Sequence, residues 1–153
     1  MPRALHIMIV EAPYYAHVSD QLAKGAVAAL QEAGATYQRV AVPGAFEIPA
    51  AIRFAATAAS RGLGPRFDGY VALGCVIRGE TTHYQHVCQE SARGLQDLAV
   101  RDELAIGFGI LTVENEAQAM ARAQVDKRNK GGEAARACLA MIALKRSFGL
   151  GPP

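Results

Sequence analysis

Residues 73–90 read LGCVIRGETTHYQHVCQE, and this stretch decides the fold that we expect for the chain. It begins as an apolar run typical of a buried strand, passes through Arg78 and a glycine, and continues with the apolar spacing of a helix. A strand that leads through such a turn into a helix gathers free backbone N–H groups at the positive end of the helix dipole. Thr81, Thr82 and His83 lie in the same turn. The stretch therefore predicts an anion site beside a group that transfers protons.

The rest of the chain alternates apolar runs with segments of helical spacing. Apolar runs predict strands at 5–10, 70–77 and 104–111, and residues 37–42, between the helix stop at Gly34 and the Pro43-Gly44 turn, are predicted as another strand. Apolar residues that recur every three or four positions predict helices at 18–33, 48–59, 84–98 and 134–148. This alternation predicts an α/β fold in one domain, residues 1–153, with a parallel sheet covered by helices on both faces.

Glycines and one capping pattern refine the second half of the chain. Gly107 and Gly109 lie inside the fourth predicted strand, where glycine indicates close approach of a ligand or of another backbone. Asn115 followed by Gln118 resembles a capping box and predicts a helix that begins near Asn115. We expect Gly131-Gly132 to interrupt that helix.

The segments that follow the four predicted strands are polar and non-repetitive. They are residues 11–15, 43–47, 75–83 and 109–115. Ligands of open parallel sheets bind beyond the carboxyl ends of the strands. We therefore expect these four segments to converge on one site.

Composition excludes several classes of function. Of the 153 residues 51% are hydrophobic and 20% charged, as in ordinary globular proteins. The net charge of +2 gives no footprint for nucleic acid, and no segment is long enough to cross a bilayer. Cys75, Cys88 and Cys138 form no Cys-x-x-Cys pair, which favours buried thiols in a reducing cytoplasm over disulfides or zinc ligands. We expect a cytoplasmic protein without nucleic-acid or membrane partners.

A metal site is the main alternative at the central motif. Glu80, His83, His86 and Glu90 have the three- and four-residue spacing that places side chains on one helix face. The Glu-x-x-His pattern is repeated nowhere else, so we favour proton transfer by His83 and no metal. His86 is expected to face solvent or a neighbouring subunit.

A small basic cluster follows the fourth predicted strand. Arg122 is a candidate phosphate ligand, because a guanidinium matches the geometry of a phosphate. Lys127 and Arg128 are expected at a solvated helix end.

Aromatic residues at two strand ends suggest a flat ligand. Phe46 and Phe108 fit either the core or the wall of a site for a planar heterocycle. Glu47 is either a carboxylate at a helix N-terminus or a partner for sugar hydroxyls. The residues alone thus predict an α/β protein that binds a phosphate near a histidine, with room for a flat ring, and they name no substrate.

Four motifs agree, in order, with one known family: VPGAFEIP at 42–49, LGCVIRGETTH at 73–83, FGILTVEN at 108–115 and NKG at 129–131. Through them the chain resembles lumazine synthases from its first strand to Phe148. The resemblance implies a flavodoxin-like three-layer sandwich with a four-stranded parallel sheet. It also implies a transferase that condenses 5-amino-6-(D-ribitylamino)uracil with 3,4-dihydroxy-2-butanone 4-phosphate to 6,7-dimethyl-8-ribityllumazine, releasing phosphate, in the penultimate step of riboflavin biosynthesis. The alternative is a non-catalytic paralogue that binds flavin or lumazine.

The resemblance also implies the roles of individual residues. His83 would transfer protons. The phosphate of the butanone phosphate would be held by Glu80, Thr81, Arg122 and Lys130. The ribitylaminouracil would be bound by Tyr14, Ala45, Phe46, Glu47, Cys75, Val76, Ile77 and Phe108, the last from a neighbouring subunit. Tyr14 stands where the family usually has Phe or Trp.

Assembly is a further implication of the resemblance. Family members need no metal or cofactor, and their sites lie between adjacent subunits of a pentamer. The few residues before Leu5 and the lack of glycine in the loop before Asn129 favour a pentamer or a pair of pentamers over an icosahedral shell. Riboflavin synthase is a candidate partner.

Overall fold

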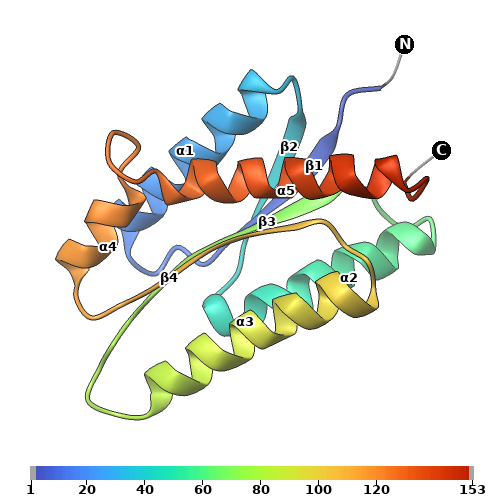
Figure 1. The fold of residues 1–153 in the computed structure, drawn as a ribbon. Coiled ribbons are helices and arrows are strands. Elements are labelled where there is room, and N and C mark those ends of the chain that lie inside the picture. Colours follow the sequence, from blue (N-terminus) through green and yellow to red (C-terminus); the bar gives the residue numbers. More distant parts are fainter. Residues whose placement is uncertain (1–2, 152–153) are drawn as a thin grey trace.

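A computed structural model describes residues 3–151 and contains a four-stranded parallel sheet between two layers of helices (Figure 1). The strands are β1 (His6–Glu11), β2 (Thr36–Ala41), β3 (Gly69–Ile77) and β4 (Ile106–Val113), in the order β2-β1-β3-β4. Helices α1 (Ala16–Glu32), α4 (Glu116–Ala123) and α5 (Lys130–Ser147) cover one face, and α2 (Ile48–Ser60) and α3 (His83–Arg101) cover the other. The three-layer α/β fold predicted from the sequence is confirmed.

Each face of the sheet carries its own apolar core. Side chains of a strand point alternately to the two faces, so the central strands β1 and β3 need apolar residues at nearly every position. Ile7, Ile9, Val71 and Leu73 pack toward α1, α4 and α5, whereas Met8, Val10, Tyr70 and Ala72 pack toward α2 and α3. This double burial explains the continuous apolar runs of the sequence.

The fourth strand and the following helix lie close to their predicted positions. β4 begins at Ile106, two residues after the predicted start, and extends to Val113. Asn115 caps α4, because its Oδ1 accepts a hydrogen bond from the backbone N of Gln118 at 2.9 Å. The side chain of Gln118 accepts from the backbone N of Glu114 at 2.8 Å, one residue before the position that a capping box would use.

The prediction that Gly131-Gly132 interrupts a helix is wrong. The interruption comes earlier, between the end of α4 at Ala123 and the start of α5 at Lys130, and both glycines lie in the first turn of α5. A Cβ on Gly131 would overlap the backbone carbonyl of Leu22 in α1. The glycine therefore allows α5 to pack closely against α1.

Gly107 in β4 allows the same helix, α5, to pack closely against the sheet. A Cβ at this position would overlap the backbone carbonyl of Ala134 in α5. Of the two alternatives left open by the sequence, close approach of another backbone is therefore the correct one for Gly107.

Strand order creates a hollow at the carboxyl ends of β1 and β3. The chain leaves β1 toward β2 on one side and returns to β3 on the other side of β1. The segments that follow these two neighbouring strands therefore diverge, which is the usual position of a ligand in an open α/β sheet.

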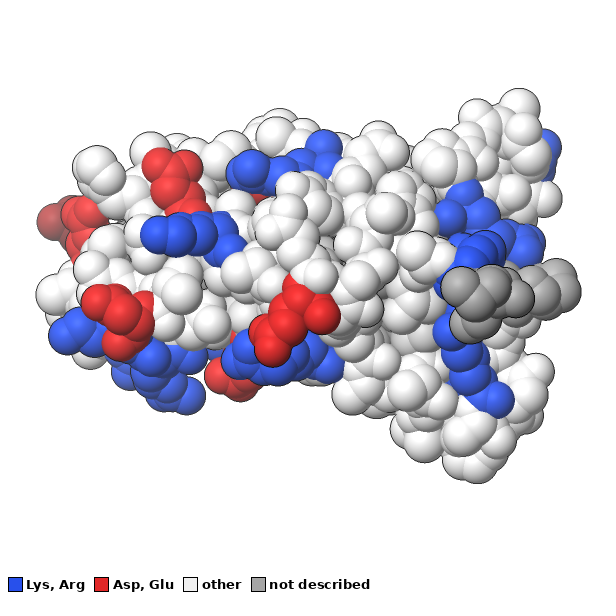
Figure 2. All heavy atoms as spheres, turned by 90° about the horizontal axis from the view of Figure 1, so that it is seen from above, with Lys and Arg blue, Asp and Glu red and all other residues white. Residues whose placement is uncertain are grey.

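Acidic and basic side chains share the surface. Figure 2 shows them interspersed over most of the face on the side of α1, α4 and α5, with basic side chains gathering at the end that carries the two termini. Over this face the charges form no stripe of one sign along its length. Within residues 3–151 no helix has the length and apolarity that crossing a membrane requires.

The close contact of α5 with α1 predicts that one methyl group added at Gly131 destabilises the fold. Gly131→Ala should lower the free energy of unfolding by about 2–3 kcal/mol, because a backbone carbonyl cannot move aside as a flexible side chain would. Gly64→Ala is the matched control, since its Cβ would lie 3.8 Å from the nearest side chain, and it should change stability by less than about 0.5 kcal/mol. Urea unfolding of both variants at one protein concentration measures the difference. Equal stability of the two variants would contradict the packing described here.

Candidate functional site

The hollow at the carboxyl ends of β1 and β3 contains a pocket of about 520 Å³, called here the His83 pocket. It is lined by residues from the loop after β1, the turn after β2, the end of β3 and the first turns of α3: Tyr14, Tyr15, Gly44, Ala45, Phe46, Glu47, Val76, Ile77, His83, His86 and Val87. Six of the predicted ligand-binding residues and the predicted proton-transfer residue therefore share one cavity within a single chain.

A short 3-10 helix presents the aromatic and acidic side chains of this pocket. The helix η1 (Ala45–Glu47) follows Gly44, whose carbonyl accepts a hydrogen bond from the backbone N of Glu47 at 3.1 Å. Ala45 is buried against the α2–α3 core and anchors the turn, whereas the Phe46 side chain is 58% exposed. The anchored turn thus leaves Phe46 and Glu47 available to a ligand.

The end of β3 supplies backbone groups to the same hollow. β3 pairs with β1 only as far as Leu73, whose carbonyl accepts from the backbone N of Ala12 at 3.0 Å. Beyond that point β3 pairs only with β4, as far as Ile77. Within the described residues, the edge of Cys75–Ile77 that faces away from β4 therefore carries no ladder hydrogen bond and can bind a polar ligand edge.

The Cys75 side chain itself does not line the pocket. It is buried in the opposite core, among the residues that pack toward α1, α4 and α5. This burial, with a smaller contribution from the charge of Glu116, raises the pKa of the Cys75 thiol to about 11. Cys75 can therefore approach a ligand through its backbone, and its thiol is a poor nucleophile near neutral pH.

The turn between β3 and α3 leads, as predicted, from the strand directly into the first turn of the helix. Glu80 and Thr81 are exposed in it, next to the His83 pocket but not on its lining. The Thr81 hydroxyl accepts a hydrogen bond from the backbone N of His83 at 3.3 Å, and Thr82 does not cap the helix with its side chain. The next backbone donors of α3 are thus available to an anion.

A second pocket, of about 230 Å³, contains three more of the predicted residues, Phe108, Arg122 and Lys130, and is called here the Arg122 pocket. It is lined by residues of β4, the end of α4 and the segment leading into α5: Phe108, Ile110, Leu111, Thr112, Arg122, Arg128 and Lys130. Arg122 donates from Nη1 to the carbonyl of Gln118 at 3.0 Å, and Lys130 Nζ donates to Glu133 at 3.1 Å. Three cationic side chains therefore surround one small cavity on the edge strand of the sheet.

Within one chain, the structure does not bring the two groups of predicted residues into one cavity. Of the residues that line the His83 pocket in the described part of the chain, none is Lys or Arg. The cations that the sequence assigns to the phosphate lie instead beside β4, which is an edge strand. The expected convergence of all four strand ends therefore holds for β1, β2 and β3, but not for β4.

Sequence reasoning missed several lining residues. His86 is exposed, as expected, and it also lines the pocket one turn after His83, which the sequence reasoning did not predict; the three-residue spacing was the available signal. Arg128 was expected at a solvated helix end, yet it lines the Arg122 pocket, because the chain turns between α4 and α5. Tyr15 lies in the 11–15 segment expected at the site but was not singled out; burial raises the pKa of its phenol, which remains protonated and can donate a hydrogen bond.

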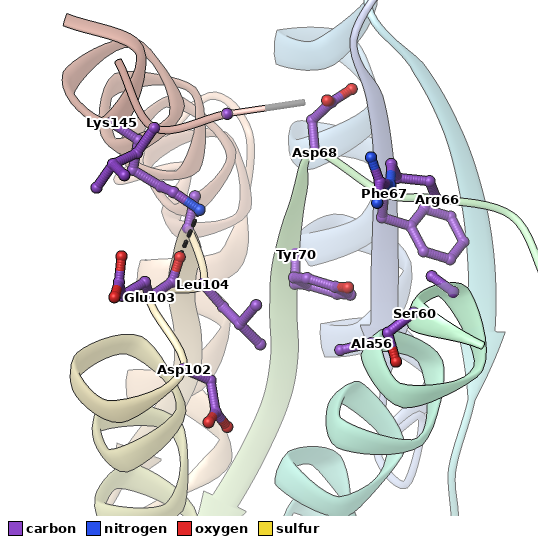
Figure 3. Close-up of a pocket in the computed structure, with 14 residues that line it drawn as sticks. Ala56, Ser60, Arg66, Phe67, Asp68, Tyr70, Asp102, Glu103, Leu104 and Lys145 are labelled. Atoms are coloured by element: carbon purple, nitrogen blue, oxygen red, sulfur yellow. Dashed lines mark hydrogen bonds between the residues drawn. The ribbon is translucent and has the colours of Figure 1, made fainter. Parts of the chain in front are cut away.

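Another cavity, of about 630 Å³, lies at the opposite end of the sheet (Figure 3). Three of its charged side chains are engaged within the chain: Asp68 binds Arg3, Asp102 binds Arg53, and Lys145 donates to the carbonyl of Glu103. It lies near the amino ends of β3 and β4, where open parallel sheets do not usually bind ligands. In residues 3–151 there is no group of three or more His, Cys, Asp or Glu placed to hold a metal ion.

Comparison with known proteins shows the family. The model of the 6,7-dimethyl-8-ribityllumazine synthase family matches residues 4–146. The chain belongs to this family. It is 58% identical to 6,7-dimethyl-8-ribityllumazine synthase of Bartonella henselae, covering 96% of this chain and 92% of that protein. It is 56% identical to the enzyme of that name from Sphingopyxis alaskensis, covering 95% and 99%. The lumazine synthase resemblance seen in the four motifs is thus confirmed.

The buried thiol of Cys75 in β3 allows a test of the packing described for the end of this strand. In a Cys88→Ala/Cys138→Ala background, Cys75 should react with iodoacetamide at about pH 8 roughly 100-fold more slowly in the folded protein than in urea, because a raised pKa removes the reactive thiolate. The folded rate should increase with pH until about pH 11. Mass spectrometry of timed samples measures both rates. Similar rates in the two states would show that the thiol is exposed and ionised.

Proposed function

We propose that this protein is the transferase that condenses 5-amino-6-(D-ribitylamino)uracil with 3,4-dihydroxy-2-butanone 4-phosphate, giving 6,7-dimethyl-8-ribityllumazine and phosphate in riboflavin biosynthesis. The observation that carries the proposal is the family match over residues 4–146. The relatives named above bear the name of the enzyme, and no observation favours a non-catalytic paralogue that binds flavin or lumazine.

The ribitylaminouracil occupies the His83 pocket. Its volume suits a small molecule, and Phe46 and Val76 supply apolar walls for a flat ring. The free backbone edge of Cys75–Ile77 hydrogen-bonds the polar edge of the pyrimidine, and Glu47 accepts hydrogen bonds from ribityl hydroxyls. Tyr14, which is 76% exposed in the single chain, stacks on the ring.

His83 transfers protons in the reaction. Attack of an amine on the ketone with loss of water, elimination of phosphate, and ring closure with loss of a second water each move a proton, and an imidazole can both give and accept one. Its position at the start of α3 holds the imidazole beside the anion turn of Glu80 and Thr81. Both substrates are reactive, so holding them in register supplies much of the catalysis.

The phosphate site is completed by a neighbouring copy of the chain. The anion turn and His83 come from one copy, and Phe108, Arg122 and Lys130 come from the next. Two observations support this arrangement: the lining of the His83 pocket has no cation within residues 3–151, and three cations surround a cavity on the edge strand β4. Developing charge on the leaving phosphate requires such cations.

The assembly that follows is a pentamer or a pair of pentamers. Exposed apolar side chains on the two helices opposite α5 support a further interface, since Phe54 of α2 is 72% exposed and Val100 of α3 is 66% exposed.

We also propose the cytoplasm as the location of the protein; the three cysteines, which are free thiols within residues 3–151, support a reducing compartment. Riboflavin synthase stays a candidate partner through the resemblance alone.

The two proposed roles predict different kinetic effects. His83→Ala should lower kcat by about 10-fold and leave the KM of the butanone phosphate within about two-fold, because proton transfer is lost and binding is kept. Arg122→Ala should raise that KM by about 10-fold or more, because a charge-assisted contact is lost. Steady-state formation of lumazine, followed by absorbance, measures both. An unchanged KM in the Arg122 variant would remove this residue from the site.

A site shared between copies predicts recovery of activity in mixed assemblies. His83→Glu and Arg122→Glu should each be inactive, because each places a carboxylate beside the phosphate. Unfolded together and refolded, equal amounts should recover about a quarter of wild-type activity, since a random neighbour pair supplies both native residues in about one case in four. The control is the same pair refolded separately and then mixed. No recovery in assemblies proved mixed by mass spectrometry would contradict a shared site.

A further inference from the structure

The side chain of Arg78 does not point to the anion turn in which it lies. Its Nε is 2.8 and 3.1 Å from the two carboxylate oxygens of Glu114, which follows β4. Its guanidinium carbon lies 4.5 Å from the ring centroid of Tyr84 in the first turn of α3. With its amide oriented to satisfy both neighbours, Gln85 accepts from Arg78 Nη1 at 3.3 Å and donates to the Thr82 carbonyl at 3.2 Å.

These contacts fix both ends of the anion turn. The backbone N of Arg78 donates to the carbonyl of Val113 at 2.9 Å and holds the start of the turn against β4. The side chain holds the end of the turn through Tyr84 and Gln85. Residues 79–83, which contain Glu80, Thr81 and His83, span the distance between these two attachments.

Further hydrogen bonds lead from Glu114 toward the Arg122 pocket. The backbone N of Glu114 donates to Oε1 of Gln118 at 2.8 Å, and the carbonyl of Gln118 accepts from Arg122 Nη1 at 3.0 Å. One chain of hydrogen bonds thus links Arg78, through Glu114 and Gln118, to Arg122. These hydrogen bonds connect the turn of Glu80 and Thr81, which belongs to one proposed site, with Arg122, which belongs to the proposed site of the neighbouring copy.

We propose that Arg78 is a positioning residue for phosphate: held by Glu114 and stacked on Tyr84, it sets the anion turn so that the donors of α3 meet the phosphate. This inference rests on the proposed function. We assign Arg78 no direct contact with phosphate, because its Nε binds the Glu114 carboxylate and its Nη1 lies 3.3 Å from the Gln85 amide. Global stability is not its role, since exposed ion pairs contribute little and these side chains are 42% and 55% exposed.

Glu114→Gln separates the two possible roles of Arg78. If Arg78 acts through Glu114, the loss of the carboxylate loosens the turn, and the KM of the butanone phosphate should increase about three- to ten-fold. If Arg78 binds phosphate directly, the same change frees the guanidinium, and that KM should stay the same or decrease. The KM of the ribitylaminouracil should stay within about two-fold in either case.

Three further variants complete the kinetic test. Arg78→Met should match or exceed the effect of Glu114→Gln on the KM of the butanone phosphate, and Arg78→Lys should restore it only in part, because an ammonium lacks the planar fork. Asp102→Asn is the matched control, because it removes another exposed arginine pair, with Arg53, that is part of neither proposed pocket nor the anion turn. It should leave both KM values unchanged.

Binding of inorganic phosphate, measured by calorimetry on each intact assembly, tests the inference without turnover. Glu114→Gln should weaken phosphate binding by the same factor by which it raises the KM, while hydrogen exchange of residues 79–83 becomes faster. Unchanged phosphate binding with unchanged exchange would overturn the role of Arg78, even if His83→Ala and Arg122→Ala behave as proposed. A wild-type protein that binds phosphate but forms no lumazine would instead overturn the proposed function and leave the phosphate comparison valid.

Discussion

The candidate site depends on one constraint of the sheet: β3 is longer than its neighbour β1. The two strands pair from Ile7 opposite Gly69 to Glu11 opposite Leu73, and β3 then continues beside β4 alone. A strand that has lost one neighbour keeps free donors and acceptors on that side. Because the sheet order sends the chain away from this point in two directions, the free edge opens into a hollow rather than into packed side chains.

The sequence was sufficient to predict the features that depend on local residue pattern. Apolar runs located three of the four strands, the turns around residues 37–42 located the other, and the 73–90 stretch located the turn between β3 and α3 with His83 at its edge. The pattern was insufficient where a glycine serves packing rather than a turn. Helix propensity alone predicts that Gly131 ends a helix. Its close approach to the Leu22 carbonyl is a tertiary contact, which the local sequence does not reveal.

Strand order explains the other differences between sequence and structure. Alternation of strands and helices predicts a parallel sheet, but it does not say which strand lies at the edge. With β4 at the edge, Phe108, Arg122 and Lys130 line a cavity of their own, and the residues that carry one predicted site are divided between two pockets. Arg128 joins the second pocket only because the chain turns between α4 and α5, a turn that the sequence did not indicate.

This division has a physical consequence for the two pockets. Three cations around one small cavity repel one another in the isolated chain, and an uncapped helix start leaves donors without a strong acceptor. A dianionic phosphate between them relieves both conditions at once, provided that a second copy brings the cations to the helix. Binding of substrate and association of chains would then favour each other, because each completes the environment that the other requires. The hydrogen bonds that lead from Arg78 through Glu114 and Gln118 to Arg122 lie within one chain, so in the proposed arrangement each copy would hold the turn of one site and the cation of the next in a fixed relation.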